Sequence, residues 1–214
     1  MKKEVEENTR LRFLNVEECK TLINCCAPHL KPNVMVALLS GMCRGEILNL
    51  KWEQVDVKHG FILLEITKNG ERREIPIDNT LTMMFNSMPR GLESVYVFTG
   101  LKTGEPYKSV QTSFETALKR AEIRDFRFHD LRHTFASHLV MAGVDLTSIR
   151  ELLGHKSLAM TIRYAHLALG RKRRAVNMLD KVLKSTQEGA PLHSFSSQFE
   201  DLEPRTSNLS HKSL

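Results

Sequence analysis

The chain has 214 residues, enough for one domain with a full hydrophobic core but too few for two large domains. Hydrophobic residues make up 41% and charged residues 26%, and no apolar run approaches the roughly 18 residues that a membrane span needs. The composition therefore excludes a membrane-spanning or wholly disordered chain. The N-terminus mixes both signs of charge and lacks the apolar segment of a secretory signal, so we expect an intracellular, cytoplasmic protein.

Charge is unevenly distributed along the chain. The net charge is +6, but residues 185–214 are acidic, which leaves 29 basic against 21 acidic residues in residues 1–184. A basic body of this kind favours a polyanionic partner such as nucleic acid, although many basic proteins bind none. Residues 185–214 are also rich in Ser, Thr, Pro and Gly without clear periodicity, so we expect them to form a flexible polar tail.

The N-terminal part of the sequence predicts helices. Asn15 and Glu18 have capping-box spacing and precede an apolar periodic segment. Gly41 interrupts a second, strongly apolar segment, and a short helix continues beyond it. The predicted helices span residues 15–26, 33–40 and 46–50, and Pro28 and Pro32 bracket the loop between the first two.

The pattern then changes to that of β-strands. His59-Gly60 and Asn69-Gly70 are turn signals, and the second is a strong hairpin signal. Lys68 directly precedes the second turn, so the hairpin would present this long side chain at its tip, within reach of a neighbouring ligand. The predicted strands span residues 54–57, 61–67 and 72–77 and form a small three-stranded antiparallel sheet.

Helical patterning returns after a polar stretch that contains Pro89, Gly91 and Gly100. Gly143 and Gly154 are helix stop signals, and Asp145 and Ser157 are predicted helix caps. The predicted helices span residues 110–121, 129–142 and 145–153, with a further helix that carries Tyr164 and a last one over 171–184. The sequence therefore predicts a mainly α fold with a small three-stranded antiparallel β-sheet.

Several polar side chains from His129 onward suggest chemistry. His129 and Arg132 share one helix face, where an imidazole and a guanidinium could bind one phosphate, although a solvated helix edge explains the same pattern. In one continuous helix His155 and Tyr164 would lie on opposite faces, but the break at Gly154 allows them to converge. From the residues alone, a tyrosine at this spacing is more often a half-buried packing residue than a nucleophile.

No metal site is predicted. His129 and His133 have the i, i+4 spacing of metal ligands, but no acidic third ligand is suitably placed. Free thiols are expected at the four cysteines, which show neither CxxC spacing nor a histidine partner at zinc-finger spacing: Cys19, Cys25, Cys26 and Cys43.

The order and spacing of several motifs resemble the tyrosine recombinase, or phage integrase, family. The motifs are the runs 129–136 (HDLRHTFA), 152–155 (LLGH) and 161–166 (TIRYAH), with residues 41–56 similar to the family's first conserved box and the Asn69-Gly70 hairpin similar to its lysine-bearing turn. The resemblance covers residues 10–184. It implies a tyrosine recombinase catalytic domain over 11–184, preceded by a linker remnant over 1–10.

The resemblance implies site-specific DNA recombination or integration without a metal or cofactor. Tyr164 would attack a phosphodiester, form a 3′-phosphotyrosine and release a 5′-hydroxyl, and a second strand's hydroxyl would reverse the step. By position, Lys68 would be the general acid, Arg132 and His155 would stabilise the transition state, and His129 would assist proton transfer. A covalent intermediate conserves the bond energy, and preorganised donors match the charge that develops on the phosphate.

The resemblance also implies partners and origin. Double-stranded DNA would be the substrate, and the basic run Arg171-Lys172-Arg173-Arg174 would contribute to binding. Homotetramers would form on DNA, whereas the isolated domain would be a monomer. Family members generally carry an N-terminal DNA-clamping domain, whereas this chain begins just before the catalytic domain. We therefore expect an excised domain or truncated product of a bacterial or phage mobile element, with weak, salt-dependent DNA binding.

One departure from the family pattern concerns the first box, which reads Gly41-Met42-Cys43-Arg44-Gly45-Glu46. Cys43 occupies the column of the family's first catalytic arginine, and Arg44 falls one place later, about 100° around a helix. Either Arg44 is recruited, or the position is vacant at a cost of about 3 kcal/mol in transition-state stabilisation. A catalytically impaired DNA-binding relative is therefore the alternative function. A topoisomerase-like activity through Tyr164 is a further one.

Overall fold

The computed structural model describes residues 11–64, 72–89, 94–100, 104–168, 176–180 and 183. The chain divides into two compact units, residues 1–169 and 170–214, and the described part of the second unit is helical. Lys68 with its Asn69-Gly70 turn, the linker over 1–10, the basic run 171–174 and the tail over 185–214 lie outside the described residues. No helix in the described ranges is long and apolar enough to cross a membrane.

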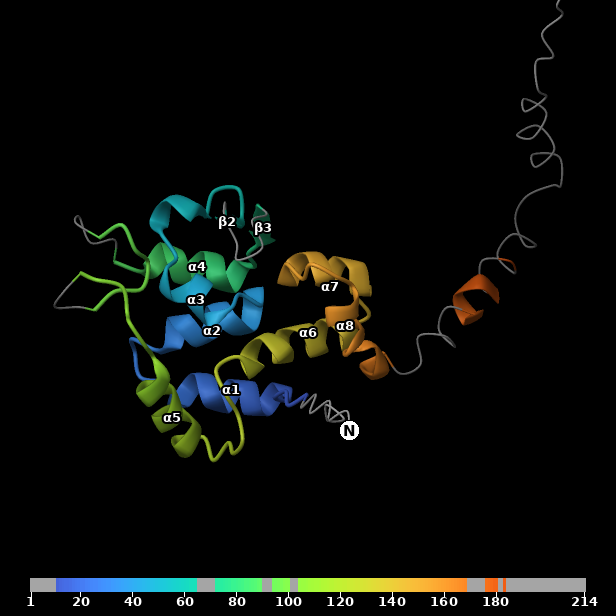
Figure 1. Cartoon of the computed structure of the whole chain (residues 1–214), viewed down its shortest axis with the longest axis horizontal. Helices are drawn as coiled ribbons and strands as arrows, with labels where there is room; N and C mark the ends of the chain where they lie inside the picture. The colour runs from blue at the N-terminus through green and yellow to red at the C-terminus, as the bar shows by residue number, and fades with distance from the viewer. Residues whose placement is uncertain are drawn as a thin grey trace, which may run out of the picture. The chain divides into compact units, whose positions relative to one another are not determined.

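The first unit confirms the predicted fold class, because it is mainly helical with one three-stranded antiparallel sheet, which lies at one side of the helices (Figure 1). Its α-helices are α1 (Val16–Cys25), α2 (Lys31–Ser40), α3 (Arg44–Leu48), α4 (Asn79–Ser87), α5 (Gln111–Arg120), α6 (Asp130–Ala142), α7 (Leu146–Leu153) and α8 (Ala159–Ile162). Its strands are β1 (Val55–Asp56), β2 (Phe61–Leu64) and β3 (Arg73–Pro76), and the short 3-10 helices are η1 (Trp52–Gln54) and η2 (Ala165–Leu167).

The sheet has the strand order β1-β2-β3, with Ile62 of β2 opposite Ile75 of β3. Residues alternate between buried and exposed along β3, so that Arg73 and Ile75 face the interior. The strand also packs against α7 (Figure 1). A charged side chain on the inward face of β3 is thereby brought next to the end of α7.

The core of the unit lies between α2 and α6. Val34, Val36 and Ala37 of α2 are buried, and Gly41 ends the helix in the left-handed conformation at φ +65°. A Cβ atom on Gly41 would collide with the ring of Phe135 on α6, so the two helices approach closely only because this residue is glycine. The start of α3 is thereby held beside α6.

Capping fixes the ends of the helices, as the sequence predicts at α1 and α7. Asn15 and Glu18 form a capping box at α1. The carboxylate of Asp145 accepts hydrogen bonds from the backbone N–H groups of Thr147 and Ser148 at the start of α7, and Gly154 ends that helix at φ +64°.

The structure corrects three local predictions. Pro32 lies in the first turn of α2 rather than in a loop, because a proline needs no N–H partner there. The polar stretch before residue 110 contains α4, which Asp78 caps and whose buried Leu81 and Phe85 supply one apolar stripe. Ser157 does not cap the next helix, since α8 begins after Leu158.

The third correction also concerns Tyr164. Helix α8 is a single turn that ends at Ile162, and Tyr164 lies between it and η2. The tyrosine is therefore presented from an irregular segment, not from the body of a helix.

Candidate active site

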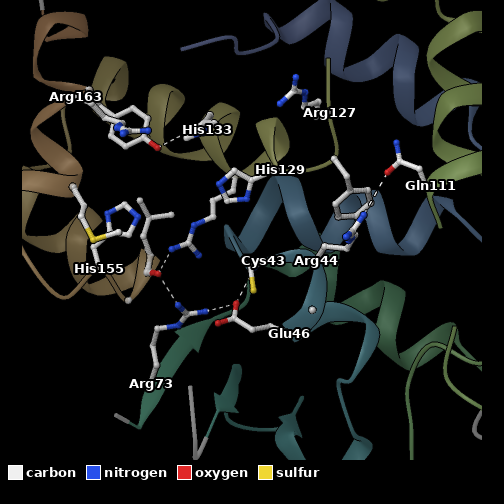
Figure 2. A pocket seen from close by; sticks show the side chains of 17 residues that line it. Cys43, Arg44, Glu46, Arg73, Gln111, Arg127, His129, His133, His155 and Arg163 are labelled. Carbon is white, nitrogen blue, oxygen red and sulfur yellow. Dashed lines mark hydrogen bonds and ion pairs between the residues drawn. The ribbon is translucent and has the colours of Figure 1, made fainter. Parts of the chain in front are cut away.

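A cavity of about 640 Å³ brings together most of the predicted site residues (Figure 2). Its walls come from the start of α3, strand β3, the N-terminal half of α6, the end of α7 and the segment around Tyr164. The predicted residues that line it are Arg44, His129, Arg132, His155 and Tyr164, together with Cys43.

Arg132 is fixed in the cavity wall by two backbone carbonyls. Its side chain is 9% exposed, its Nη1 donates to the Gly41 oxygen at 2.7 Å, and its Nη2 donates to the Leu153 oxygen. Burial lowers the pKa of Arg132, and the neighbouring Arg73 lowers it further. A guanidinium has five N–H donors, so those not used by the two carbonyls are left to bind an anion from a fixed position.

His155 follows the left-handed turn at Gly154 and points into the cavity (Figure 2). Its Nδ1 shares a 2.9 Å hydrogen bond with the hydroxyl of Thr161, which is fully buried. Burial, and then the nearby Arg132, lower the pKa of His155 to about 4. The imidazole is therefore neutral at pH 7, and its bond to Thr161 holds it in one orientation, as suits a group preorganised to bind a phosphate.

Tyr164 is buried, with 1% of its surface exposed. Its hydroxyl and Nδ1 of His133 share a 2.6 Å hydrogen bond (Figure 2). Burial raises the pKa of Tyr164 and lowers that of His133 to about 4. At neutral pH both partners are uncharged, so the phenol is protonated and bound to a histidine that the sequence did not assign to the site.

His129 lies just before α6, and its side chain is accessible to solvent at the cavity wall. Its ring meets that of His133 edge to face, with centroids 5.0 Å apart. Burial, and then Arg132, lower the pKa of His129. Within the described ranges, no cluster of three or more His, Cys, Asp or Glu side chains is placed to hold a metal ion.

In the first box, the side chains of Cys43 and Arg44 point in different directions, toward Glu46 and toward Gln111 (Figure 2). Cys43 immediately precedes α3, and its backbone N–H donates to the Glu46 carboxylate at 2.8 Å. Burial and the adjacent Glu46 raise the pKa of the Cys43 thiol, so it is neutral at pH 7. Arg44 is exposed, lines the cavity and donates to Oε1 of Gln111 at 3.4 Å.

Sequence reasoning missed Arg73, which occupies the same cavity wall. Its Nη2 lies 2.8 Å from the Glu46 carboxylate, and its Nη1 donates to the Leu153 oxygen at 2.6 Å. The available signal was the alternation of β3, in which Arg73 shares the inward face with Ile75. The contacts of His133 and Thr161 had no such signal, because the segment around Tyr164 is irregular.

Comparison with known proteins places this chain in a family. The profile of the phage integrase family matches residues 12–186. The integrase of Salmonella phage P22 is 38% identical over 176 residues, which are 76% of this chain and 45% of that integrase. The chain thus spans under half the length of this relative.

Solved structures of integrases have the same fold as this chain. The catalytic domain of bacteriophage HP1 integrase superimposes with a TM-score of 0.63 at 32% identity, covering 78% of this chain and 95% of that domain. The Tn1549 transposon integrase in complex with circular intermediate DNA, at 18% identity, has the same fold, with a TM-score of 0.63 over 81% of this chain and 68% of that one. The fold is that of tyrosine recombinase catalytic domains, and the chain belongs to the phage integrase family.

Proposed function

We propose that this chain is the catalytic part of a site-specific DNA recombinase, which cleaves and rejoins DNA strands through Tyr164. The observation that carries the proposal is the convergence of Arg132, His155 and Tyr164 on one cavity, in a chain of the phage integrase family. The substrate class is supported by the Tn1549 integrase structure, which contains DNA, and by the excess of basic residues over 1–184.

In the proposed reaction, the Tyr164 oxygen attacks the phosphorus of a phosphodiester. A bond forms between that oxygen and the phosphorus, the bond to the 5′-oxygen of the next nucleotide breaks, and the leaving oxygen takes up a proton. The tyrosine proton passes to a base, for which accessible His129 is the proposed group. The Tyr164 hydroxyl is buried and bonded to His133. Before attack, it must therefore leave His133 and become accessible to the phosphate.

Arg132 and His155 are the proposed stabilisers of the transition state. The carbonyls of Gly41 and Leu153 hold Arg132, and the Thr161 hydroxyl holds His155, so neither side chain has to reorganise during the reaction. Donors fixed in this way are worth most where negative charge develops, here on the non-bridging phosphate oxygens.

The remaining roles rest on the family resemblance alone. Lys68 is the proposed general acid that protonates the leaving 5′-oxygen, and the basic run 171–174 is proposed to contact the DNA backbone. We propose a monomer without DNA and a tetramer on DNA, with residues 11–184 as the catalytic domain. Light scattering of the chain with and without a bound duplex measures the two states directly.

Incubation with nicked suicide DNA tests the proposed reaction. The DNA would be a library of nicked duplexes of randomised sequence, because the target site is unknown, and the buffer would contain EDTA. We expect a covalent protein–DNA adduct on a denaturing gel that disappears in Tyr164→Phe. An adduct of equal yield in that variant would exclude Tyr164 as the nucleophile.

The identity of residue 43 raises a second candidate function, although the relatives of this chain are integrases and tyrosine recombinases. Because Cys43 is neutral and Arg44 is bonded to Gln111, the chain is a candidate for a DNA-binding relative without turnover. The residues retained at positions 129, 132, 155 and 164 argue against this alternative. It predicts binding on a native gel, no adduct with the natural chain, and an adduct once Cys43→Arg is introduced.

A further inference from the structure

Arg73 is a charged side chain that is 8% exposed, on the inward face of a strand. A buried guanidinium is costly unless it is paired and hydrogen-bonded, so its partners indicate what it holds together. Its Nε atom is buried without a hydrogen-bond partner, so among the described residues the partners of the group are those of its two Nη atoms. Those partners are Glu46 and the Leu153 carbonyl.

Each of these partners supports a different part of the cavity. The Glu46 carboxylate also accepts the backbone N–H of Cys43, so it fixes the start of α3. The Leu153 carbonyl also accepts from Nη2 of Arg132. Arg73 therefore links strand β3 to α3 and to the end of α7, and it shares one acceptor with Arg132 (Figure 2).

The turn that carries His155 is built around Arg73. Gly154 has φ +64°, and a Cβ atom at this residue would collide with Nη1 of Arg73. The guanidinium thus lies against the backbone of the residue that precedes His155. Within the described residues, Arg73 is also the ion-pair partner of Glu46. The neutral Cys43 thiol beside Glu46 adds no positive charge there.

We propose that Arg73 is a positioning residue for DNA cleavage: by joining Glu46 to the Leu153 carbonyl, it holds Arg132 and the His155 turn in the geometry that receives the phosphate. The inference rests on the proposed function. We assign Arg73 to positioning because its hydrogen bonds go to Glu46 and to the Leu153 carbonyl, which also accepts from Arg132.

The kinetic test separates positioning from binding. Single-turnover adduct formation on nicked suicide DNA would be measured against protein concentration, for Arg73→Lys and Arg73→Gln in the natural chain and in the Cys43→Arg background. We expect the rate at saturating protein to fall at least tenfold in both variants, with the half-saturating concentration changed less than threefold. Lysine keeps the charge but cannot bridge both acceptors in the same way.

Arg72→Gln is the matched control, because Arg72 is the adjacent residue, carries the same charge and is exposed. We expect its saturating rate to stay within threefold of the parent. Equal losses in Arg72→Gln and Arg73→Gln would overturn the proposal in favour of a general charge effect. An unchanged saturating rate in Arg73→Lys would overturn it as well.

A second measurement does not depend on cleavage. NMR of the guanidinium groups reports whether rotation about the Cζ–Nη bonds of Arg132 is hindered. We expect separate Nη signals for Arg132 in the natural chain and averaged signals in Arg73→Lys, with thermal unfolding confirming that the variant is folded. Unchanged Arg132 signals would overturn the positioning role. Absence of an adduct in every chain, with averaged Arg132 signals in the variant, would contradict the proposed function and leave the role of Arg73 supported.

Discussion

At position 43, the side chain determines whether one further positive charge faces the cavity. The neutral Cys43 thiol stands where the family resemblance places an arginine, and Arg44 is turned toward Gln111. Removal of one preorganised donor typically costs about 3 kcal/mol in transition-state stabilisation, which is about a hundredfold in rate.

Cys43→Arg should therefore raise the rate of adduct formation about a hundredfold. The measurement is single-turnover cleavage of nicked suicide DNA at saturating protein. Cys43→Met serves as the control, because it enlarges the side chain without adding charge, and it should leave the rate low. An arginine variant no faster than the natural chain would show that position 43 is not a vacancy in the site.

The pKa values of two histidines in the cavity predict how the stability of the chain depends on pH. Burial lowers the pKa of both His133 and His155 to about 4 in the folded chain, against about 6.5 in an unfolded one. Between these values the unfolded state binds more protons, so the free energy of unfolding rises with pH. The stability that depends on these two histidines being neutral is fully present above about pH 6.5 and is lost as the pH falls toward 4.

We therefore expect the urea midpoint of the natural chain to rise between about pH 4.5 and 6.5, and the rise to be smaller in His155→Asn. His166→Asn is the control, since His166 is exposed and should leave the pH dependence unchanged. A pH dependence that is the same in His155→Asn as in the natural chain would contradict the lowered pKa of His155.

At the scale of elements, the end of α7 connects the fold to the site. Gly154 ends the helix in the left-handed region, and its Cα faces a guanidinium that Glu46 and Leu153 hold in place. Gly143 ends α6 in the same region, at φ +102°, with no atom near its missing Cβ. The two glycines therefore differ in what surrounds them.

Gly154→Ala should destabilise the chain by more than Gly143→Ala. Both variants place a Cβ in the left-handed region, at a cost of about 1 kcal/mol, but only the first also displaces Arg73. Urea unfolding of the two variants measures the difference, and Gly154→Ala should also slow adduct formation. Equal losses of stability would mean that a Cβ at residue 154 is accommodated without displacing Arg73.

Local signals predicted most elements but not the contacts of the site. Capping residues such as Asn15 and Asp145 and the glycine stop at Gly154 act within a few residues, so the sequence reveals them. Helix α4 was missed, although Leu81, Met84 and Phe85 have the i, i+3, i+4 spacing of an apolar helix face. The contact between His133 and Tyr164 joins residues 31 positions apart, and no local pattern encodes it.

The motifs from His129 to Tyr164 identified the family, and the structure brings Arg132, His129, His155 and Tyr164 to one cavity. Arg73 and Glu46 are 27 positions apart and meet only in the folded chain, where β3 packs against α7, so their pairing is a tertiary property. A charged residue in an inward strand position was the single local sign of it. Lys68 and residues 171–174 lie outside the described residues and stay predictions.

For the whole molecule, the basic charge over residues 1–184 predicts DNA binding dominated by phosphate contacts. The affinity for a duplex should fall about a hundredfold or more between about 50 and 200 mM salt, as measured by fluorescence anisotropy. Replacing residues 171–174 with glutamine should reduce the slope of log affinity against log salt concentration. Replacing Arg205 and Lys212 is the control and should leave the slope unchanged. An affinity that does not respond to salt would contradict phosphate-dominated binding.

The central claim is that Tyr164 becomes covalently linked to DNA. The most direct measurement is mass spectrometry of peptides from the Cys43→Arg chain after reaction with nicked suicide DNA and digestion with nuclease and protease. We predict a nucleotide attached through its 3′-phosphate to the peptide that contains Tyr164. A nucleotide found on Tyr96, on Tyr107 or on no peptide at all would contradict the claim.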